Sequence, residues 1–247
     1  MTDDWDFYFL QVDDKPASIY VDLGAHDFAP NPKLPHMAYV RLHMREPRDD
    51  GLSSRAEFDA LVSVEDALTA SLVNVETQYV GRCTTDSCRD FFFYVSHPQA
   101  WSSRVAACML SFDCYKYEAD TREEPDWSSY FSYLYPSDAD RQTIENRRVC
   151  EALKRNGDKL SEPREIDHWA YFADAKSLTA YVEEALQLGF KVRAISAPDD
   201  TRDNHSAQLW RSDIPALNSI DDVTLPLFNL AAKNGGEYDG WESIVVS

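Results

Sequence analysis

The chain has 247 residues, of which 44% are hydrophobic and 13% aromatic, enough apolar material for one large domain or two ordinary ones; this excludes a disordered composition. Its formal net charge is −19, and residues 1–140 carry 25 Asp and Glu against 11 Lys and Arg. A field of that sign repels phosphate backbones, so we expect no direct nucleic-acid binding. It fits a basic protein partner, although an acidic surface can also serve solubility alone.

The first half of the chain predicts a β-hairpin followed by a β-α-β-β-α-β unit. Two extended runs, Trp5–Val12 and Ser18–Leu23, flank a turn at Asp13-Asp14-Lys15-Pro16. The next elements are, in order, a strand at Met37–Arg45, a helix, strands at Thr77–Cys83 and Asp90–Ser96, a helix from Pro98 to Phe112, and a strand at Tyr115–Ala119. The first of these helices opens with the capping-box spacing Ser54-Arg55-Ala56-Glu57 and carries four apolar residues on one face: Phe58, Leu61, Leu68 and Leu72. We interpret the aromatic segment Trp127–Tyr135 as an extension of this sheet.

The second half predicts the same order of elements behind an additional helix. They are a helix at Asp138–Asn156, a strand at Glu165–Ala173, a helix capped by Asp174, a strand at Phe190–Ser196, a polar loop at Pro198–His205, a strand at Ser206–Arg211, a helix at Asp221–Lys233 with Pro226 in or near its first turn, and a strand at Tyr238–Val246. We therefore predict an α+β protein with two ferredoxin-like sandwich domains, residues 1–136 and 137–247, the first preceded by a β-hairpin and the second by a helix.

Other sequence features limit location and chemistry. No run of about 18 apolar residues predicts a membrane span. The acidic start Met1-Thr2-Asp3-Asp4 is unlike a secretory signal. Five cysteines, an odd number at low density, are typical of free thiols in a reducing compartment. We expect a cytoplasmic protein without membrane contact.

The most specific segment of the C-terminal half is Gly235-Gly236-Glu237-Tyr238-Asp239-Gly240-Trp241-Glu242, supported by Gly157-Asp158, the run from Pro163 to Phe172, and Gly189-Phe190. On these residues, the C-terminal half resembles the regulator of ribonuclease E activity B family. The segment that begins Trp5-Asp6-Phe7-Tyr8-Phe9 resembles a bacterial domain of unknown function that precedes this family's domain in some proteins. The resemblance implies a non-catalytic regulator that binds ribonuclease E or degradosome components and lowers the nuclease activity. Relatives tend to carry an acidic tail after the signature, and this chain stops at Ser247.

Six residues are candidates for partner binding: Asp167, Trp169, Glu237, Tyr238, Asp239 and Trp241. The carboxylates would meet cationic groups, and the aromatic side chains would either anchor the partner or support the surface from the core. Asp-Gly at 239–240 favours a turn or bulge. Sheet edges that can pair leave a homodimer possible.

Catalytic and metal-binding interpretations have weaker support. Asp167 next to His168 could tune an acid–base group, but adjacent strand residues point to opposite faces. Cys83 and Cys88 could form half of a zinc site, yet no second short pair follows. Phosphate-loop, dinucleotide and nucleophile-elbow motifs are absent. We predict no enzyme, cofactor or metal; a small-ligand module and a metal-assisted hydrolase that uses the acidic loops remain the alternatives.

Overall fold

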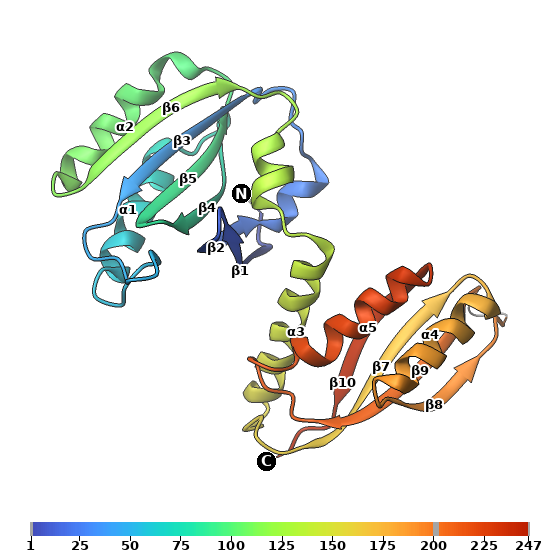
Figure 1. The fold of residues 1–247 in the computed structure, drawn as a ribbon. Helices are drawn as coiled ribbons and strands as arrows, with labels where there is room; N and C mark the ends of the chain where they lie inside the picture. The colour runs from blue at the N-terminus through green and yellow to red at the C-terminus, as the bar shows by residue number, and fades with distance from the viewer. Residues whose placement is uncertain (1, 200–202, 247) are drawn as a thin grey trace. The chain divides into compact units, whose positions relative to one another are not determined.

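The computed structural model describes residues 2–199 and 203–246, and it divides into two compact units between Pro136 and Ser137. Each unit is a mixed α+β structure with its own antiparallel sheet and its own core (Figure 1). The predicted α+β class with two sandwich units is confirmed. Part of the predicted polar loop at Pro198–His205 lies outside the described residues.

The described part of the first unit contains a six-stranded antiparallel sheet with the strand order β1-β2-β4-β5-β3-β6. The strands are β1 (Trp5–Val12), β2 (Lys15–Asp22), β3 (His36–His43), β4 (Thr77–Thr85), β5 (Cys88–Val95) and β6 (Lys116–Glu123). With α1 (Phe58–Leu72) and α2 (Trp101–Met109), the elements from β3 to β6 follow the ferredoxin-like order, and the β1–β2 hairpin extends the sheet at β4. Short 3₁₀ turns, η1 (Leu23–Asp27), η2 (Pro98–Ala100) and η3 (Leu110–Phe112), complete the unit.

Strand β5 is covered on both faces, which explains its run of aromatic residues. Phe91 and Phe93 join the core formed with α1 and α2. Phe92 and Tyr94 point to the opposite face, because side chains alternate along a strand. There the ring of Tyr94 stacks on Trp127 with centroids 3.9 Å apart. Both faces of the sheet are therefore packed at this strand.

The predicted sheet extension at Trp127–Tyr135 is wrong, because this segment is helical. It contains a six-residue π-helix, η4 (Ser129–Leu134), which packs on the sheet face away from α1 and α2. Its buried tyrosine Tyr130 donates a hydrogen bond to the carbonyl of Asp22 at 2.7 Å, and the Trp127 indole donates to the carbonyl of Leu34 at 3.0 Å. A strand would have alternated these polar tips between two faces, whereas the positive φ of Trp127 and the π-helix that follows it direct both inward.

The predicted turn at Asp13-Asp14-Lys15-Pro16 is shorter than expected, and a second hairpin turn of the first unit has the same length. Asp13 and Asp14 both have positive φ, and Val12 pairs directly with Lys15, so this is a two-residue turn. Asp86 and Ser87 do the same between β4 and β5. Phe58, predicted on the buried face of its helix, is 47% exposed at the first helical position.

The described part of the second unit has a four-stranded sheet in the order β10-β7-β9-β8, the ferredoxin-like arrangement (Figure 1). Its elements are α3 (Asp138–Arg155), β7 (Arg164–Phe172), α4 (Ala175–Gln187), β8 (Lys191–Ser196), β9 (His205–Asp213), α5 (Asp221–Lys233) and β10 (Gly236–Ser243). Asp174 caps α4 as predicted, accepting from the amides of Lys176 and Ser177. Pro226 lies in the second turn of α5, beyond the first turn where a missing N–H costs nothing.

Figure 1 shows α4 and α5 on one face of this sheet, and their apolar side chains form one core with the inward residues of the strands. No described helix is long and apolar enough to cross a membrane.

Candidate partner-binding surface

The face of the second sheet opposite α4 and α5 is the candidate surface, and we call it the open face. Strand β7 alternates strictly: Ile166, His168, Ala170 and Phe172 are buried under the helices. The intervening residues point the other way: Glu165, Asp167, Trp169 and Tyr171. The open face therefore begins as a row of two carboxylates and two aromatic rings.

Neighbouring strands add side chains to this row. Asp167 lies directly opposite Trp210 on β9 and Glu242 on β10. Tyr171 lies opposite Glu237. Because residues directly opposite in antiparallel strands share a face, these side chains all belong to the open face.

Arg193 on β8 organises the carboxylates. Its Nε donates a short hydrogen bond to Asp167, and its Nη2 donates to Glu165 at 2.6 Å. The guanidinium also lies 5.1 Å from the ring centroid of Trp210, which Lys191 approaches at 4.5 Å. The hydrogen bonds to Glu165 and Asp167 raise the pKa of Arg193. The result is a fixed cluster of charges above an aromatic ring.

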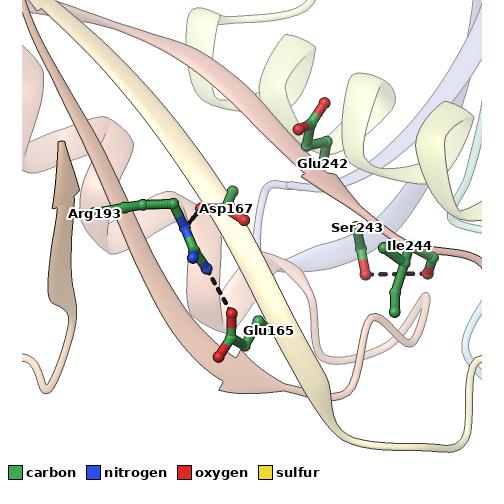
Figure 2. Close-up of a pocket in the computed structure, with 6 residues that line it drawn as sticks. All are labelled: Glu165, Asp167, Arg193, Glu242, Ser243 and Ile244. Carbon is green, nitrogen blue, oxygen red and sulfur yellow. Dashed lines mark hydrogen bonds and ion pairs between the residues drawn. The ribbon is translucent and has the colours of Figure 1, made fainter.

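A hollow of about 580 Å³ opens where this cluster meets the end of β10 (Figure 2). It is lined by Glu165, Asp167, Arg193, Glu242, Ser243 and Ile244. Three carboxylates and one guanidinium line it, and Ile244 is 71% exposed. A net negative rim with an exposed apolar side chain suits a partner that presents a cation beside an apolar group.

The six predicted binding residues divide between the two faces of the sheet. Asp167 and Trp169 lie on the open face, and Glu237 and Asp239 are exposed on β10. Tyr238 and Trp241 are only 6% and 7% exposed and belong to the core. These two aromatic residues therefore support the surface from the core and are not exposed as anchors for a partner.

A β-bulge brings both Tyr238 and Trp241 inward. Residues three apart in a regular strand point to opposite faces. The register of β10 against β7 shifts between Tyr238 and Gly240, so one additional residue is accommodated, and Gly240 has φ +122. Gly236 is required for a steric reason, because a Cβ at this position would lie 2.1 Å from the Phe172 ring.

His168 is a buried core residue, away from the Asp167 carboxylate on the opposite face. Its Nδ1 and the Tyr238 hydroxyl are 2.8 Å apart, and its ring meets Phe190 edge-on with centroids 5.4 Å apart. Its Nε2 has no hydrogen-bond partner among the described residues. Burial, assisted by the nearby charge of Arg211, lowers the pKa of His168 to about 3, so the ring is neutral near pH 7. This environment suits packing and not acid–base chemistry.

Asn146 on α3 is a structural residue that sequence reasoning missed. Its Oδ1 accepts from the Trp241 indole and from Gln142, both at 2.9 Å. Its Nδ2 donates to Asp221 and Thr224, both at 2.7 Å. One buried amide thus joins α3, α5 and β10. A lone Asn on the apolar face of a predicted helix is the signal that could have identified it.

The Gly157-Asp158 segment also has a structural explanation. Asp158 accepts from Arg164 at 2.6 Å and from the backbone amides of Leu160 and Val246. Burial alone would raise the pKa of Asp158, but these donors outweigh it, and the pKa is lowered. The Asp158–Arg164 ion pair and the hydrogen bond from the Val246 amide hold the chain after β10 against the start of β7, beside the hollow.

Metal-ligating side chains do not gather in threes within residues 2–199 and 203–246. Cys83 is buried and its sulfur contacts the Tyr133 hydroxyl at 3.2 Å, whereas Cys88 lies 3.5 Å from Nδ1 of His43. Burial raises the pKa of the Cys83 thiol to about 11 and also raises that of Cys88. Both shifts favour the protonated thiol over the thiolate.

Two family models match the chain, one for each unit. Residues 3–135 match the family of unknown function DUF695, and residues 143–243 match regulator of ribonuclease activity B. No match to a curated protein accompanies them. The chain therefore belongs to the DUF695 family of unknown function and carries, in its second unit, a regulator of ribonuclease activity B domain.

Proposed function

We propose that this protein is a non-catalytic, cytoplasmic regulator that binds a ribonuclease E-type endonuclease or another degradosome component and lowers RNA cleavage. The match of the second unit to regulator of ribonuclease activity B supports the regulatory role. Five free cysteines, two of them buried, are compatible with a reducing compartment.

The observation that carries the proposal is the open face of the second sheet. It presents Asp167, Trp169 and Glu237 together on one side of a rigid sheet, next to the hollow that Arg193 organises. Sheet-borne side chains hold their positions better than loop-borne ones, which favours specific recognition. The acidic rim and the net charge of −19 favour a partner segment rich in Lys or Arg over a nucleic acid.

Each residue has a defined role in this proposal. Asp167, Glu237 and Asp239 meet cations of the partner, while the ring of Trp169 contributes apolar contact area. Tyr238 and Trp241 hold β10 in register below the surface through His168 and Asn146.

The test measures binding of the full chain to purified ribonuclease E from the same host by isothermal titration calorimetry, together with cleavage of a reporter RNA. We expect Trp169→Ser and the double variant Glu237→Gln with Asp239→Asn each to weaken binding at least tenfold and to relieve inhibition to the same extent. Unchanged melting temperatures would show that the variants are folded.

The matched control is Glu183→Gln, which removes an exposed carboxylate from α4 on the opposite face. It should bind like the parent chain. Equal losses per carboxylate removed, one in Glu183→Gln and two in the open-face double variant, would show that only net charge matters and would reject a specific surface. Full binding by Trp169→Ser and the double variant would reject the open face altogether.

A further inference from the structure

A second site lies in the first unit, independent of the proposed function. A groove of about 480 Å³ runs over β3 and β5 beside the π-helix η4, on the sheet face away from α1 and α2. π-helices are rare and occur frequently at functional sites. The volume is within the range of small-molecule pockets.

The middle of the groove is aromatic. Tyr39 on β3 and Phe92 on β5 lie directly opposite each other and form its floor. The ring of Tyr133, from η4, stands 5.7 Å from that of Phe92 and forms one wall. A flat apolar body would lie against these rings.

One end of the groove holds Arg122, whose side chain is 61% exposed. Its Nε donates to the buried carboxylate of Glu124 at 2.8 Å, and its Nη2 forms an ion pair with the same carboxylate and donates to the Ser129 hydroxyl at 2.6 Å. Burial raises the pKa of Glu124, but hydrogen bonds from Tyr94, Ser129 and Arg122 outweigh it and lower the pKa, so the carboxylate stays ionised. Arg122 is thereby held in place from its inner edge.

The other end holds Arg41 in the same way. Asp90 accepts from its Nε at 2.8 Å and from its Nη2 at 2.6 Å, and the Arg41 side chain is still 46% exposed. Within the described residues, the Nη1 groups of Arg41 and Arg122 make no hydrogen bond. Each guanidinium is fixed by a carboxylate on one edge and retains donors on the other.

We propose that this groove binds an elongated small organic dianion with a flat apolar or aromatic body, its two carboxylate or phosphate groups accepting hydrogen bonds from Arg41 and Arg122. Arg122 pairs with Met37 across the strands, so the two cations are four strand residues apart, or roughly 13 Å between Cα atoms. The long arginine side chains can close part of that distance. A monoanion would engage only one end.

A fixed carboxylate–arginine pair at each end, Asp90 with Arg41 and Glu124 with Arg122, explains how a strongly acidic chain can bind an anion. The two arginines and their carboxylate partners together carry a net charge near zero, because Asp90 in the lining and the buried Glu124 behind it offset the two cations. Affinity would then come from directed hydrogen bonds and ring contact more than from a long-range field, and it should depend only weakly on salt.

The test uses a para-linked biphenyl dicarboxylate as probe, with the full chain, and measures binding by isothermal titration calorimetry. The biphenyl monocarboxylate of the same body is the ligand control. We expect the dicarboxylate to bind at least tenfold more tightly than the monocarboxylate, and Arg41→Gln and Arg122→Gln each to remove most of that difference.

Two further variants separate a loss of binding from a loss of folding. Ser128→Asp places a negative charge at the Arg122 end without removing any hydrogen bond of the Glu124 network, and it should weaken dicarboxylate binding at least tenfold. Arg48→Gln, an exposed arginine paired with Asp50 outside the groove, should bind like the parent. No binding at millimolar probe, equal binding of the two probes, or equal effects of Ser128→Asp and Arg48→Gln would each overturn the proposal.

Discussion

His168 and Asn146 place polar atoms in the core of the second unit, and the two residues differ in how completely those atoms are satisfied. Asn146 uses its amide fully, with hydrogen bonds to four partners. His168 has a partner only at Nδ1, because Nε2 is buried without one among the described residues. A neutral ring tolerates that position, whereas a protonated ring would bury an uncompensated charge.

The stability of the second unit should therefore decrease on mild acidification. The unfolded chain binds a proton at His168 near pH 6.5, while the folded chain resists it until about pH 3. The contribution of His168 is present in full above pH 6.5, and it is lost at about 1.4 kcal/mol per pH unit as the pH falls below that value. Urea unfolding followed through NMR signals of β7 would measure it.

The variant His168→Gln separates the contribution of His168 to the pH dependence of stability from that of the many carboxylates that also titrate. It should cost stability at pH 7.5, but its deficit should shrink by about 2 kcal/mol at pH 5, because glutamine does not bind a proton. Parallel curves for the parent and His168→Gln would show that the ring is not held neutral by burial.

At the scale of single elements, β10 depends on one irregular step. The bulge at Asp239 and Gly240 places Tyr238 and Trp241 in the core and leaves Glu237 and Asp239 outside. Gly240 provides the φ of +122 that the step requires, and nothing lies within 4 Å of the Cβ it lacks. The requirement is therefore conformational and not steric.

Replacing Gly240 by alanine should destabilise the second unit by about 1–3 kcal/mol, the usual cost of such a backbone conformation in a residue with a side chain. Thermal unfolding would measure the loss. The neighbouring change Asp239→Ala, at an exposed bulge position, should stay within about 0.5 kcal/mol of the parent. Equal stability of Gly240→Ala and the parent would show that the bulge can rearrange without strain.

At the scale of the whole molecule, the two hydrophobic cores are separate sets of residues. The first core draws on β3, β4, β5, α1 and α2, and the second on the elements after Pro136. Neither set contains a residue of the other unit. Each unit has the features of an independently folding domain.

We expect two unfolding transitions in calorimetry of the full chain. Leu61→Ala should lower the midpoint of only the first-unit transition, and Leu209→Ala that of only the second. Each change should reduce the free energy of unfolding of its own unit by about 2–5 kcal/mol, because both leucines are completely buried. Circular dichroism of the variants at low temperature would confirm that both remain folded. A shift of both transitions by either change would show that the units unfold as one.

The sequence alone determined the order of the elements, because apolar periodicity, turn residues and helix caps are local signals. The order β-α-β-β-α-β in each half and the cap at Asp174 could both be predicted from short windows. The aromatic segment Trp127–Tyr135 could not, because aromatic residues suit both strands and helices, and its π-helix depends on hydrogen bonds to residues as distant as Asp22 and Leu34.

Tertiary structure alone decided which of the candidate residues lie at the surface and which lie in the core. Asp167 and Trp169 follow from strand alternation, but the inward direction of both Tyr238 and Trp241 requires a bulge whose register is set by pairing with β7. The buried partners Asn146 and Asp158 are far along the chain from the groups they satisfy. Local sequence fixes what a residue can do, while long-range pairing determines whether it does so in the core or at the surface.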